Sequence, residues 1–424
     1  MSSASPPSAA IPRLPPQPPH NLTRRAALSL ASAAALAACH RAAGTLGQGM
    51  ADPEARAVYA AREGRAAWTG DRARTLARII AGAPAHGLPP TAFAPATGKG
   101  AALDEALTLS ALKYAHALAS GLVDPRKVEK DFTLRRNKPD LAAGLAKALG
   151  GDLEGWFAAL APADAGYKAI SAAYLAAAAD SPQARQLAAN LERRRWLDRA
   201  PPDHRIDVNI ATAVLAYRRP GQPDAIARVV VGGPKHQTPC IEAAFEQLVV
   251  NPPWRVPTEI AAKEILPKGP AYMAREDMRM VDGRVEQQPG PKSALGQVKF
   301  DLKDPYDIYL HDTPAKALFA AAERHRSHGC VRVDNAVAFA RGLAAETGRA
   351  DAFDQALATQ DTHEVALGQS IPVRLFYHTA EPDPAGQVVL ARDVYGTDDR
   401  LAEALGLGAA RTSDDGADDG DTGP

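Results

Sequence analysis

The hydrophobic pattern of this 424-residue chain changes once, near residues 196–204, and that change constrains the fold more than any other feature. From about residue 51 to residue 197, apolar residues recur at spacings of three and four, which predicts amphipathic helices. After this point come short β-type runs such as AIARVVVGG, AFEQLVVNPPW and PVRLFYH. We therefore predict an α+β protein, with an α-helical domain over residues 40–198 and a mostly β domain over residues 199–405, built as a mixed sheet or a small sandwich.

A long segment, about residues 255–298, interrupts the predicted β domain and carries five prolines and few β signals. Segments of that length inside a compact domain usually act as lids or binding loops, so we interpret it as a lid. Residues 406–424 are acidic and poor in apolar side chains, which predicts a disordered tail. Lysine plus arginine total 49 and aspartate plus glutamate total 49, and this balance removes the simplest electrostatic support for binding nucleic acid.

The first 39 residues have the pattern of an export signal. Arg24 and Arg25 precede an apolar run over residues 26–38, which is too short to span a bilayer as a mature helix and predicts a signal peptide. The paired arginines resemble a twin-arginine signal, and the general secretory route stays open. The run ends in LAAC, which looks like a bacterial lipobox and predicts lipidation of Cys39; ordinary cleavage after A-x-A is the alternative. We expect an exported, periplasmic protein that is anchored to a membrane through Cys39.

The stretch HRSHGCVRV, residues 325–333, places one of only three cysteines in the chain beside a glycine and close to histidines. Cysteine acts as a nucleophile through its thiolate, so a catalytic Cys330 needs a base or an imidazolium nearby. His328 precedes Cys330 by two residues, and on an extended chain both side chains would point to the same face. His311 follows the apolar run DIYL at an expected strand end, and it is the second candidate base.

Two neighbours of Cys330 fit the same chemistry. Gly329 lacks a Cβ, so backbone amides at this point could approach a substrate closely and form an oxyanion hole. Arg332 carries a fork that suits a carboxylate, and it shares the face of Cys330 if the strand continues. Two other interpretations stay open: a disulfide between Cys330 and Cys240 in an oxidising compartment, and a zinc site built from His311, His325, His328 and Cys330.

The segment YLHDTP, which contains His311, is followed by SHGCVRV, with fifteen residues between His311 and Ser327. This pair of segments resembles the signature of the L,D-transpeptidase (YkuD) catalytic domain. The segments VVVGG, NPPWRVP, PGPKSALGQVKF and DVYGTDD resemble the large periplasmic, YcbB-like branch of that family, and YAAREGRAAW and ASGLVDP resemble its N-terminal scaffold. The chain departs from the branch in two ways, because it shows no recognisable peptidoglycan-binding module and because Arg326 stands where relatives tend to carry an aromatic residue.

The resemblance implies a role for each residue of the signature. Cys330 would be the nucleophile that forms a thioester, and His311 would be the general base and acid, oriented by the carbonyl or the carboxylate of Asp312. Backbone amides at Gly329 would form the oxyanion hole, with His328 as support for the loop. No metal or organic cofactor is implied. The residues expected to contact the substrate are Arg332, Ser327, Tyr309 and Trp254.

The function that the resemblance implies is peptidoglycan L,D-transpeptidation. The thioester would release D-alanine from a diaminopimelate-containing stem peptide, and an amine of a second stem would then resolve it into a 3–3 crosslink. Wall-synthesis proteins are the expected partners, and members of the family are susceptible to carbapenems. Three alternatives remain: an L,D-carboxypeptidase, attachment of the stem to a lysine of an envelope protein, and a non-catalytic wall scaffold lipoprotein with Cys240 and Cys330 in a disulfide.

Overall fold

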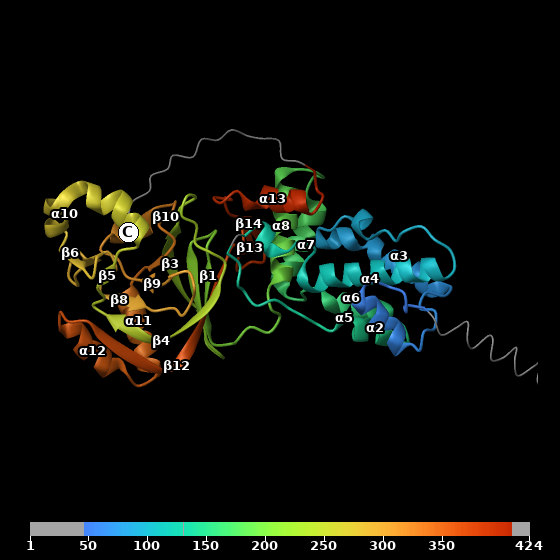
Figure 1. Ribbon diagram of the computed structural model, residues 1–424, viewed down its shortest axis with the longest axis horizontal. Helices are drawn as coiled ribbons and strands as arrows, with labels where there is room; N and C mark the ends of the chain where they lie inside the picture. The colour runs from blue at the N-terminus through green and yellow to red at the C-terminus, as the bar shows by residue number, and fades with distance from the viewer. Residues whose placement is uncertain (1–45, 130, 409–424) are drawn as a thin grey trace, which may run out of the picture.

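The computed structural model describes residues 46–129 and 131–408. The predicted signal peptide, the lipidation site at Cys39 and most of the acidic tail lie outside the described residues. Figure 1 shows a helical region on one side and a strand-rich region on the other, as the pattern change predicts. The last helix of the first region ends at Trp196, and the first strand begins at Arg205. No helix within the described ranges is both long and apolar enough to cross a bilayer.

In the described residues the helical domain contains seven α-helices, which pack around a large apolar core and, between α7 and α8, a smaller one. Aspartate or serine caps begin most of them; the Asp52 and Asp140 carboxylates, for example, accept bonds from amides in the first turn of the helices that follow. Its core includes Leu76, Phe157 and Trp196. The helices are α2 (Pro53–Ala61), α3 (Asp71–Ala81), α4 (Ala101–Ser120), α5 (Leu141–Ala148), α6 (Leu153–Leu160), α7 (Ala165–Ala176) and α8 (Pro182–Trp196).

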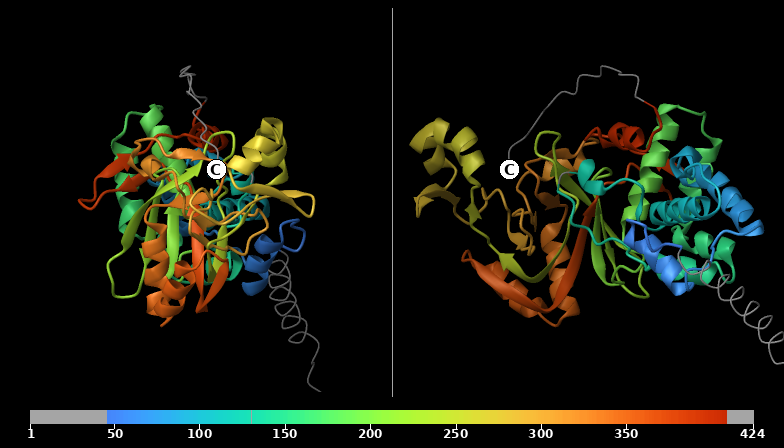
Figure 2. Two further views of the ribbon diagram at one scale, coloured as in Figure 1. Left: turned by 90° about the vertical axis from the view of Figure 1, so that its left-hand side faces the viewer. Right: turned by 45° about the vertical axis from the view of Figure 1, so that its right-hand side comes forward.

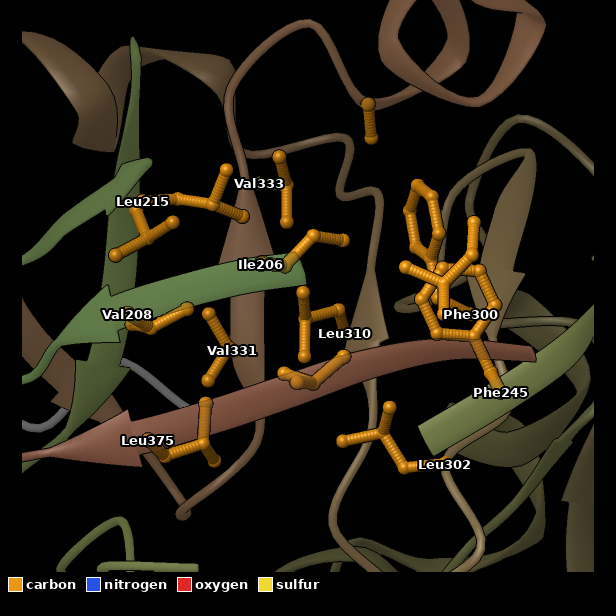
Figure 3. Close-up of a cluster of buried hydrophobic side chains, with 14 of the residues drawn as sticks. Ile206, Val208, Leu215, Phe245, Phe300, Leu302, Leu310, Val331, Val333 and Leu375 are labelled. Carbon is orange, nitrogen blue, oxygen red and sulfur yellow. The ribbon is translucent and has the colours of Figure 1, made fainter. Parts of the chain in front are cut away.

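The second region is built on one mixed sheet of nine strands, in the order β10-β3-β11-β9-β8-β4-β12-β1-β2. Strand β2 also pairs with β3, so the sheet curls back on itself. Its inner face buries a cluster of aliphatic and aromatic side chains, shown in Figure 3. The strands are β1 (Arg205–Asn209), β2 (Val214–Arg218), β3 (Ala225–Gly232), β4 (Glu242–Val250), β8 (Val298–Phe300), β9 (Leu310–His311), β10 (His325–Ser327), β11 (Val331–Val333) and β12 (His363–Phe376).

Two helices that the sequence analysis did not predict lie within the β region. Helices α11 (Ala336–Glu346) and α12 (Ala350–Ala358) pack against the sheet and contribute Leu343 and Phe353 to its core. Their sequence is rich in alanine, as in the first domain, and it lies directly between two runs of β type. The sheet needs a cover on its apolar face, and this helical pair supplies one.

The predicted lid carries regular structure and a small core of its own. It contains α9 (Thr258–Ile260), the π-helix η4 (Ala261–Ile265), the 3₁₀-helix η5 (Leu266–Lys268) and α10 (Gly269–Arg275). It also forms a three-stranded sheet from β5 (Trp254–Arg255), β7 (Arg284–Gln287) and β6 (Met278–Val281), so the expectation of little β structure was wrong here. The signal that was missed is Asp-Gly: Asp282 and Gly283 both have positive φ, as a two-residue hairpin turn requires. Figures 1 and 2 place α10 and β6 at the end of the sheet far from the helical domain.

The C-terminal elements return to the helical domain. Strands β13 (Ala380–Pro382) and β14 (Val388–Leu390) contact α7, and α13 (Thr397–Ala404) lies along α8. Leu401 and Leu405 belong to the core of the helical domain. The range 199–405 that we predicted for the catalytic domain therefore includes a final segment that packs on the scaffold.

Candidate active site

The register between two short parallel strands places the candidate chemical groups on one face of the sheet. Strand β9 pairs with β11, with Leu310 opposite Val331 and His311 opposite Arg332. Side chains alternate along a strand. Because Leu310 and Val331 point into the core in Figure 3, His311 and Arg332 face the other side. The strand pairing also continues one residue earlier, since the Val331 amide donates to the Tyr309 carbonyl at 3.1 Å, which brings Cys330 next to β9.

The imidazole of His311 is buried and held in one orientation. Its Nδ1 lies 2.5 Å from the backbone carbonyl of Asp312. A carbonyl oxygen only accepts, so Nδ1 carries the proton and Nε2 is the nitrogen free to take one. Burial, followed by the positive charge of Arg332, lowers the pKa of His311 to about 3, so the ring is neutral at pH 7. Of the two expected orienting groups, the Asp312 carbonyl holds the ring, while its carboxylate binds Lys316 and the Gln297 amide.

Cys330 is a thiol at rest, and the residue is partly buried. Desolvation raises its pKa to about 11, against the opposite effects of hydrogen bonds with Tyr309 and of the Lys299 charge. Its Sγ lies 3.8 Å from the Asp307 carbonyl. From the sequence we expected a neighbouring base or imidazolium to lower the pKa of Cys330, but in the structure this pKa is raised. Cys330 and His311 are therefore both neutral at pH 7. This favours a mechanism in which His311 removes the thiol proton during the attack, and it disfavours a thiolate–imidazolium pair formed beforehand.

Because the pKa of Cys330 is raised, the rate at which the wild-type protein is alkylated should depend on pH in a specific way. Below pH 11 the thiol form of Cys330 dominates, and its thiolate fraction rises about tenfold per pH unit, because the pKa is displaced upward. We expect the rate of alkylation by iodoacetamide to keep rising from pH 7 to about pH 10. Intact-protein mass spectrometry measures the rate, and a Cys330→Ala variant gives the background from buried Cys240. A plateau reached below pH 9 would contradict the assigned ionisation.

Gly329 adopts a backbone conformation that other residues rarely reach, with φ of +113°. A Cβ built there would meet no atom closer than 3.6 Å, so glycine is required by conformation and not by lack of space. Its amide donates to Ser327 Oγ at 3.2 Å, and Ser327 Oγ donates to the Cys330 carbonyl at 2.6 Å. The Gly329 amide is therefore already engaged, unlike the free oxyanion donor that we expected. Ser327 is 2% exposed and braces the loop instead of meeting a substrate.

We expect Gly329→Ala to destabilise the loop and slow any chemistry at Cys330. The substitution forces a β-carbon into the positive-φ region, at a cost of about 1–3 kcal/mol in the free energy of unfolding. Gly342→Ala is the matched control, because Gly342 lies within α11 with open space around it and should gain about 0.5–1 kcal/mol. Chemical denaturation measures both. Equal stability of the two variants would refute the conformational explanation.

His328 contacts the segment that we predicted as a lid. Its Nε2 lies 2.8 Å from the Glu264 carboxylate of η4, and its ring lies 4.6 Å from that of His236. Gly329, between His328 and Cys330, has a positive φ, so the backbone there is not the regular extended chain that the expectation of a shared face assumed. His328 therefore joins the catalytic loop to the lid, which fits a supporting role for the loop.

The predicted substrate contacts differ in accessibility. Arg332 is 1% exposed, so its position does not fit direct capture of a substrate carboxylate; its clear effect is on His311. Trp254 is 3% exposed and belongs to the lid core, while Tyr309 is half-buried beside His311, with ring centroids 5.5 Å apart.

Lys299 is a cation near the site that we did not predict from the sequence. It lies on β8 opposite His311, with its Nζ 4.4 Å from the centre of the Tyr309 ring. The alternating run QVKF was the available signal.

The two alternative uses of the cysteine do not fit the described part of the chain. Cys240 and Cys330 are both free thiols, and Cys240 is buried in the core, near Glu129 and Trp196. The four proposed zinc ligands do not converge. His325 contacts Glu323 and the Ile210 carbonyl, while His328 contacts Glu264. Across residues 46–129 and 131–408, no group of three or more His, Cys, Asp or Glu side chains could hold a metal ion.

Comparison with known proteins assigns both regions. Residues 203–346 match the family model of the L,D-transpeptidase catalytic domain (YkuD), and residues 53–174 match that of the scaffold domain. A Haemophilus influenzae protein that is provisionally named an L,D-transpeptidase is 33% identical over 242 residues, covering 51% of this chain and 48% of that protein. The chain thus spans about half the length of the curated relative it matches. The matched catalytic range contains His311, Cys330 and all the strands between them.

Proposed function

Because residues 203–346 belong to the YkuD family of L,D-transpeptidase catalytic domains, we propose that this protein is a cysteine-dependent peptidoglycan L,D-transpeptidase that forms 3–3 crosslinks. The observation that supports the proposal is the β9–β11 register, which puts Cys330 beside the strand that carries His311, whose buried, neutral imidazole has its Nδ1 already bonded. A nucleophile beside a base that a third group orients is the arrangement that acyl transfer through a covalent intermediate requires.

The first half of the reaction removes D-alanine from a tetrapeptide stem. As Cys330 Sγ attacks the carbonyl carbon of the third residue, His311 Nε2 takes the thiol proton. Negative charge develops on the carbonyl oxygen, and the Cys330 amide is the donor best placed to stabilise it, since the Gly329 amide is bonded to Ser327. The tetrahedral intermediate collapses when the C–N bond breaks, and D-alanine leaves with the proton from His311. A thioester between Cys330 and the stem remains.

The second half transfers the stem to an amine. The amino group of a second diaminopimelate-containing stem attacks the thioester, His311 accepts its proton, and the sulfur leaves and recovers that proton as a thiol. Water competes with the amine for the same thioester. The lid core around Trp254 and the bond from His328 to Glu264 hold the lid beside the catalytic loop, and this position favours exclusion of water.

Product analysis tests the proposal. Purified protein is incubated with tetrapeptide muropeptides, and mass spectrometry identifies the products. We expect dimers joined through two third residues together with free D-alanine. Tripeptides without dimers would identify an L,D-carboxypeptidase, and stem attached only to an added lysine-containing envelope protein would identify an anchoring enzyme. No release of D-alanine in any mixture would contradict the proposed chemistry altogether.

We also propose that the protein is exported to the periplasm and anchored there by a lipid on Cys39, where a wall-synthesis partner could supply the substrate contact of the missing binding module. The support is the Arg24-Arg25 pair, the apolar run after it and the LAAC ending. Cys39→Ala should move the protein from the membrane fraction to the soluble periplasmic fraction, because a thioether needs the sulfur. Retention of the variant in the membrane fraction would show that lipidation is not the anchor.

A further inference from the structure

Two buried hydroxyl groups lie behind the catalytic loop and bond to its backbone. Thr238, in the turn after β3, is 3% exposed, and Tyr395, just before α13, is 7% exposed. Thr238 Oγ1 accepts from the Gly232 amide at 2.9 Å and donates to the Gly329 carbonyl at 2.7 Å. Tyr395 Oη donates to the Gly232 carbonyl at 2.7 Å and accepts from the Thr238 amide at 3.1 Å. Each hydroxyl is thus both donor and acceptor, a combination that no apolar side chain can replace.

The bond from Thr238 to Gly329 has a direct consequence for Cys330. The carbonyl of Gly329 and the amide N–H of Cys330 belong to one planar peptide unit, and in a trans peptide they point in opposite directions. A hydrogen bond that pins the carbonyl therefore sets the direction of the N–H. This restraint matters here because Gly329, at φ of +113°, has no side chain of its own to limit rotation.

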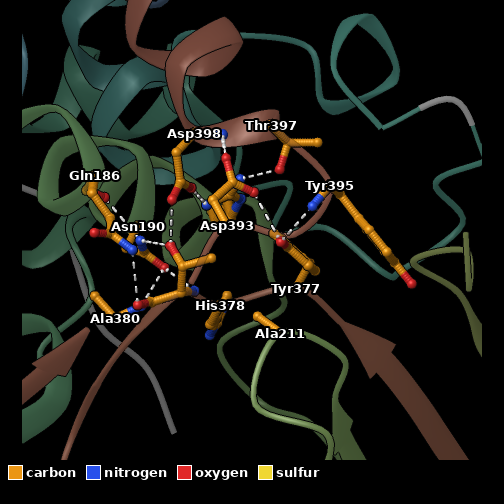
Figure 4. A network of polar contacts seen from close by, with 12 residues as sticks. Gln186, Asn190, Ala211, Tyr377, His378, Ala380, Asp393, Tyr395, Thr397 and Asp398 are labelled. Carbon is orange, nitrogen blue, oxygen red and sulfur yellow. Dashed lines mark hydrogen bonds and ion pairs between the residues drawn. The ribbon is translucent and has the colours of Figure 1, made fainter. Parts of the chain in front are cut away.

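We call the linked hydroxyls of Thr238 and Tyr395 the brace. The Tyr395 end of the brace is held in place by further contacts. The Tyr395 ring stacks on Tyr377 at 4.9 Å and 9°, and the Tyr395 amide donates to Tyr377 Oη at 3.1 Å. Tyr377 Oη donates to Asp393, whose carboxylate also accepts from the Asp398 amide at 2.7 Å. Figure 4 shows these contacts. Asp398 is ion-paired with Arg193 of α8, so the brace ends on a buried contact with the helical domain.

We propose that Thr238 and Tyr395 are positioning residues that aim the Cys330 amide at the oxyanion of the tetrahedral intermediate. The proposal rests on the proposed acyl transfer. Neither side chain touches a substrate, since both are buried behind the loop. Because the restraint acts on the donor to a developing charge, its loss should slow acylation while leaving initial ligand binding and the intrinsic reactivity of the thiol unchanged.

Two substitutions remove the brace with little change in volume. Tyr395→Phe keeps the stacked ring and removes the hydroxyl, and Thr238→Val keeps the branched shape and removes Oγ1. Stopped-flow acylation of the full-length protein by a carbapenem separates the initial dissociation constant from the acylation rate constant. We expect the acylation rate constant to fall by about tenfold to 100-fold, a part of the loss that removal of a whole oxyanion donor produces. The dissociation constant should stay within twofold.

Alkylation of Cys330 by iodoacetamide distinguishes a positioning role from general disruption, because that reaction develops no oxyanion. We expect its rate to be unchanged in both variants. Thr238→Ser retains Oγ1 and should restore acylation to within about threefold of wild type. Tyr114→Phe, in the core of the helical domain, is the matched control and should acylate like wild type.

Two results would overturn the inference: acylation at the wild-type rate in both variants, or equal losses of acylation and alkylation, which would indicate a disordered loop. Failure of the proposed function has a different signature. In that case the wild-type protein itself would show no acylation, whereas failure of the brace leaves the wild type fully reactive.

Discussion

Replacing Cys330 by alanine should abolish release of D-alanine and formation of the covalent carbapenem adduct, an expected loss of at least about 10³-fold. Removing the sulfur removes the only atom at this point of the face that can form the thioester, and the residual rate would come from binding and oxyanion stabilisation alone. Alanine fits at the partly exposed position without a cavity, so the thermal midpoint should stay close to that of wild type. Intact-protein mass spectrometry after incubation with a carbapenem measures the adduct.

Cys240→Ala is the control for that experiment. Cys240 is buried near Trp196 of the helical domain, and burial raises its pKa well above the ordinary value, so it is a poor nucleophile. This variant should keep acylation even if its stability falls. An adduct that persists in Cys330→Ala but disappears in Cys240→Ala would show that Cys240 is the nucleophile, and this would contradict the proposal.

Replacing His311 by asparagine should lower the acylation rate constant by about 10²-fold to 10⁴-fold, the range typical of a lost general base. The amide can still donate to the Asp312 carbonyl, but it cannot accept the thiol proton. The pKa of Cys330 is raised to about 11, so the thiol must lose its proton during the attack. We therefore expect the acylation rate to depend more on the base here than in a cysteine enzyme whose nucleophile is already a thiolate. His116→Asn, on the exposed surface of the helical domain, is the matched control.

The pH profile gives the same experiment a second readout. The pKa of His311 is lowered to about 3, so the base form is present at every pH above this value. Wild-type acylation should therefore hold its rate as the pH falls from 7 to 5, where an ordinary histidine with a pKa near 6.5 would lose activity. A decline centred near pH 6.5, absent from His311→Asn, would refute the assigned ionisation while supporting the role of the base.

The neutral pair also explains why burial of Arg332 matters. Its charge is held close to His311 in a poorly solvated part of the sheet, and it opposes protonation of the imidazole. If His311 carries the proton during the proposed reaction, we expect the same charge to favour its transfer onward to the leaving amine.

Several features of the site were within reach of sequence analysis and others were not. The gap between His311 and Ser327 and the SHGC segment predicted Cys330 as nucleophile and His311 as base, because the spacing within a motif is a property of the chain alone. The direction of His328 was not predictable, since it depends on the positive φ of Gly329. Thr238 and Tyr395 are separated by 157 residues and meet only because the chain returns from β12 to the helical domain.

The sequence by itself determined the order of a helical and a β region, and it predicted a boundary between them and the candidate reactive groups. These follow from periodicity and motif spacing, which act between residues close in the chain. Only the tertiary structure decided that the sheet curls back on itself through β2 and β3, that α13 joins the scaffold, and that the thiol and imidazole are both neutral. Strand register and burial decide those features, and both arise from contacts between segments far apart in the sequence.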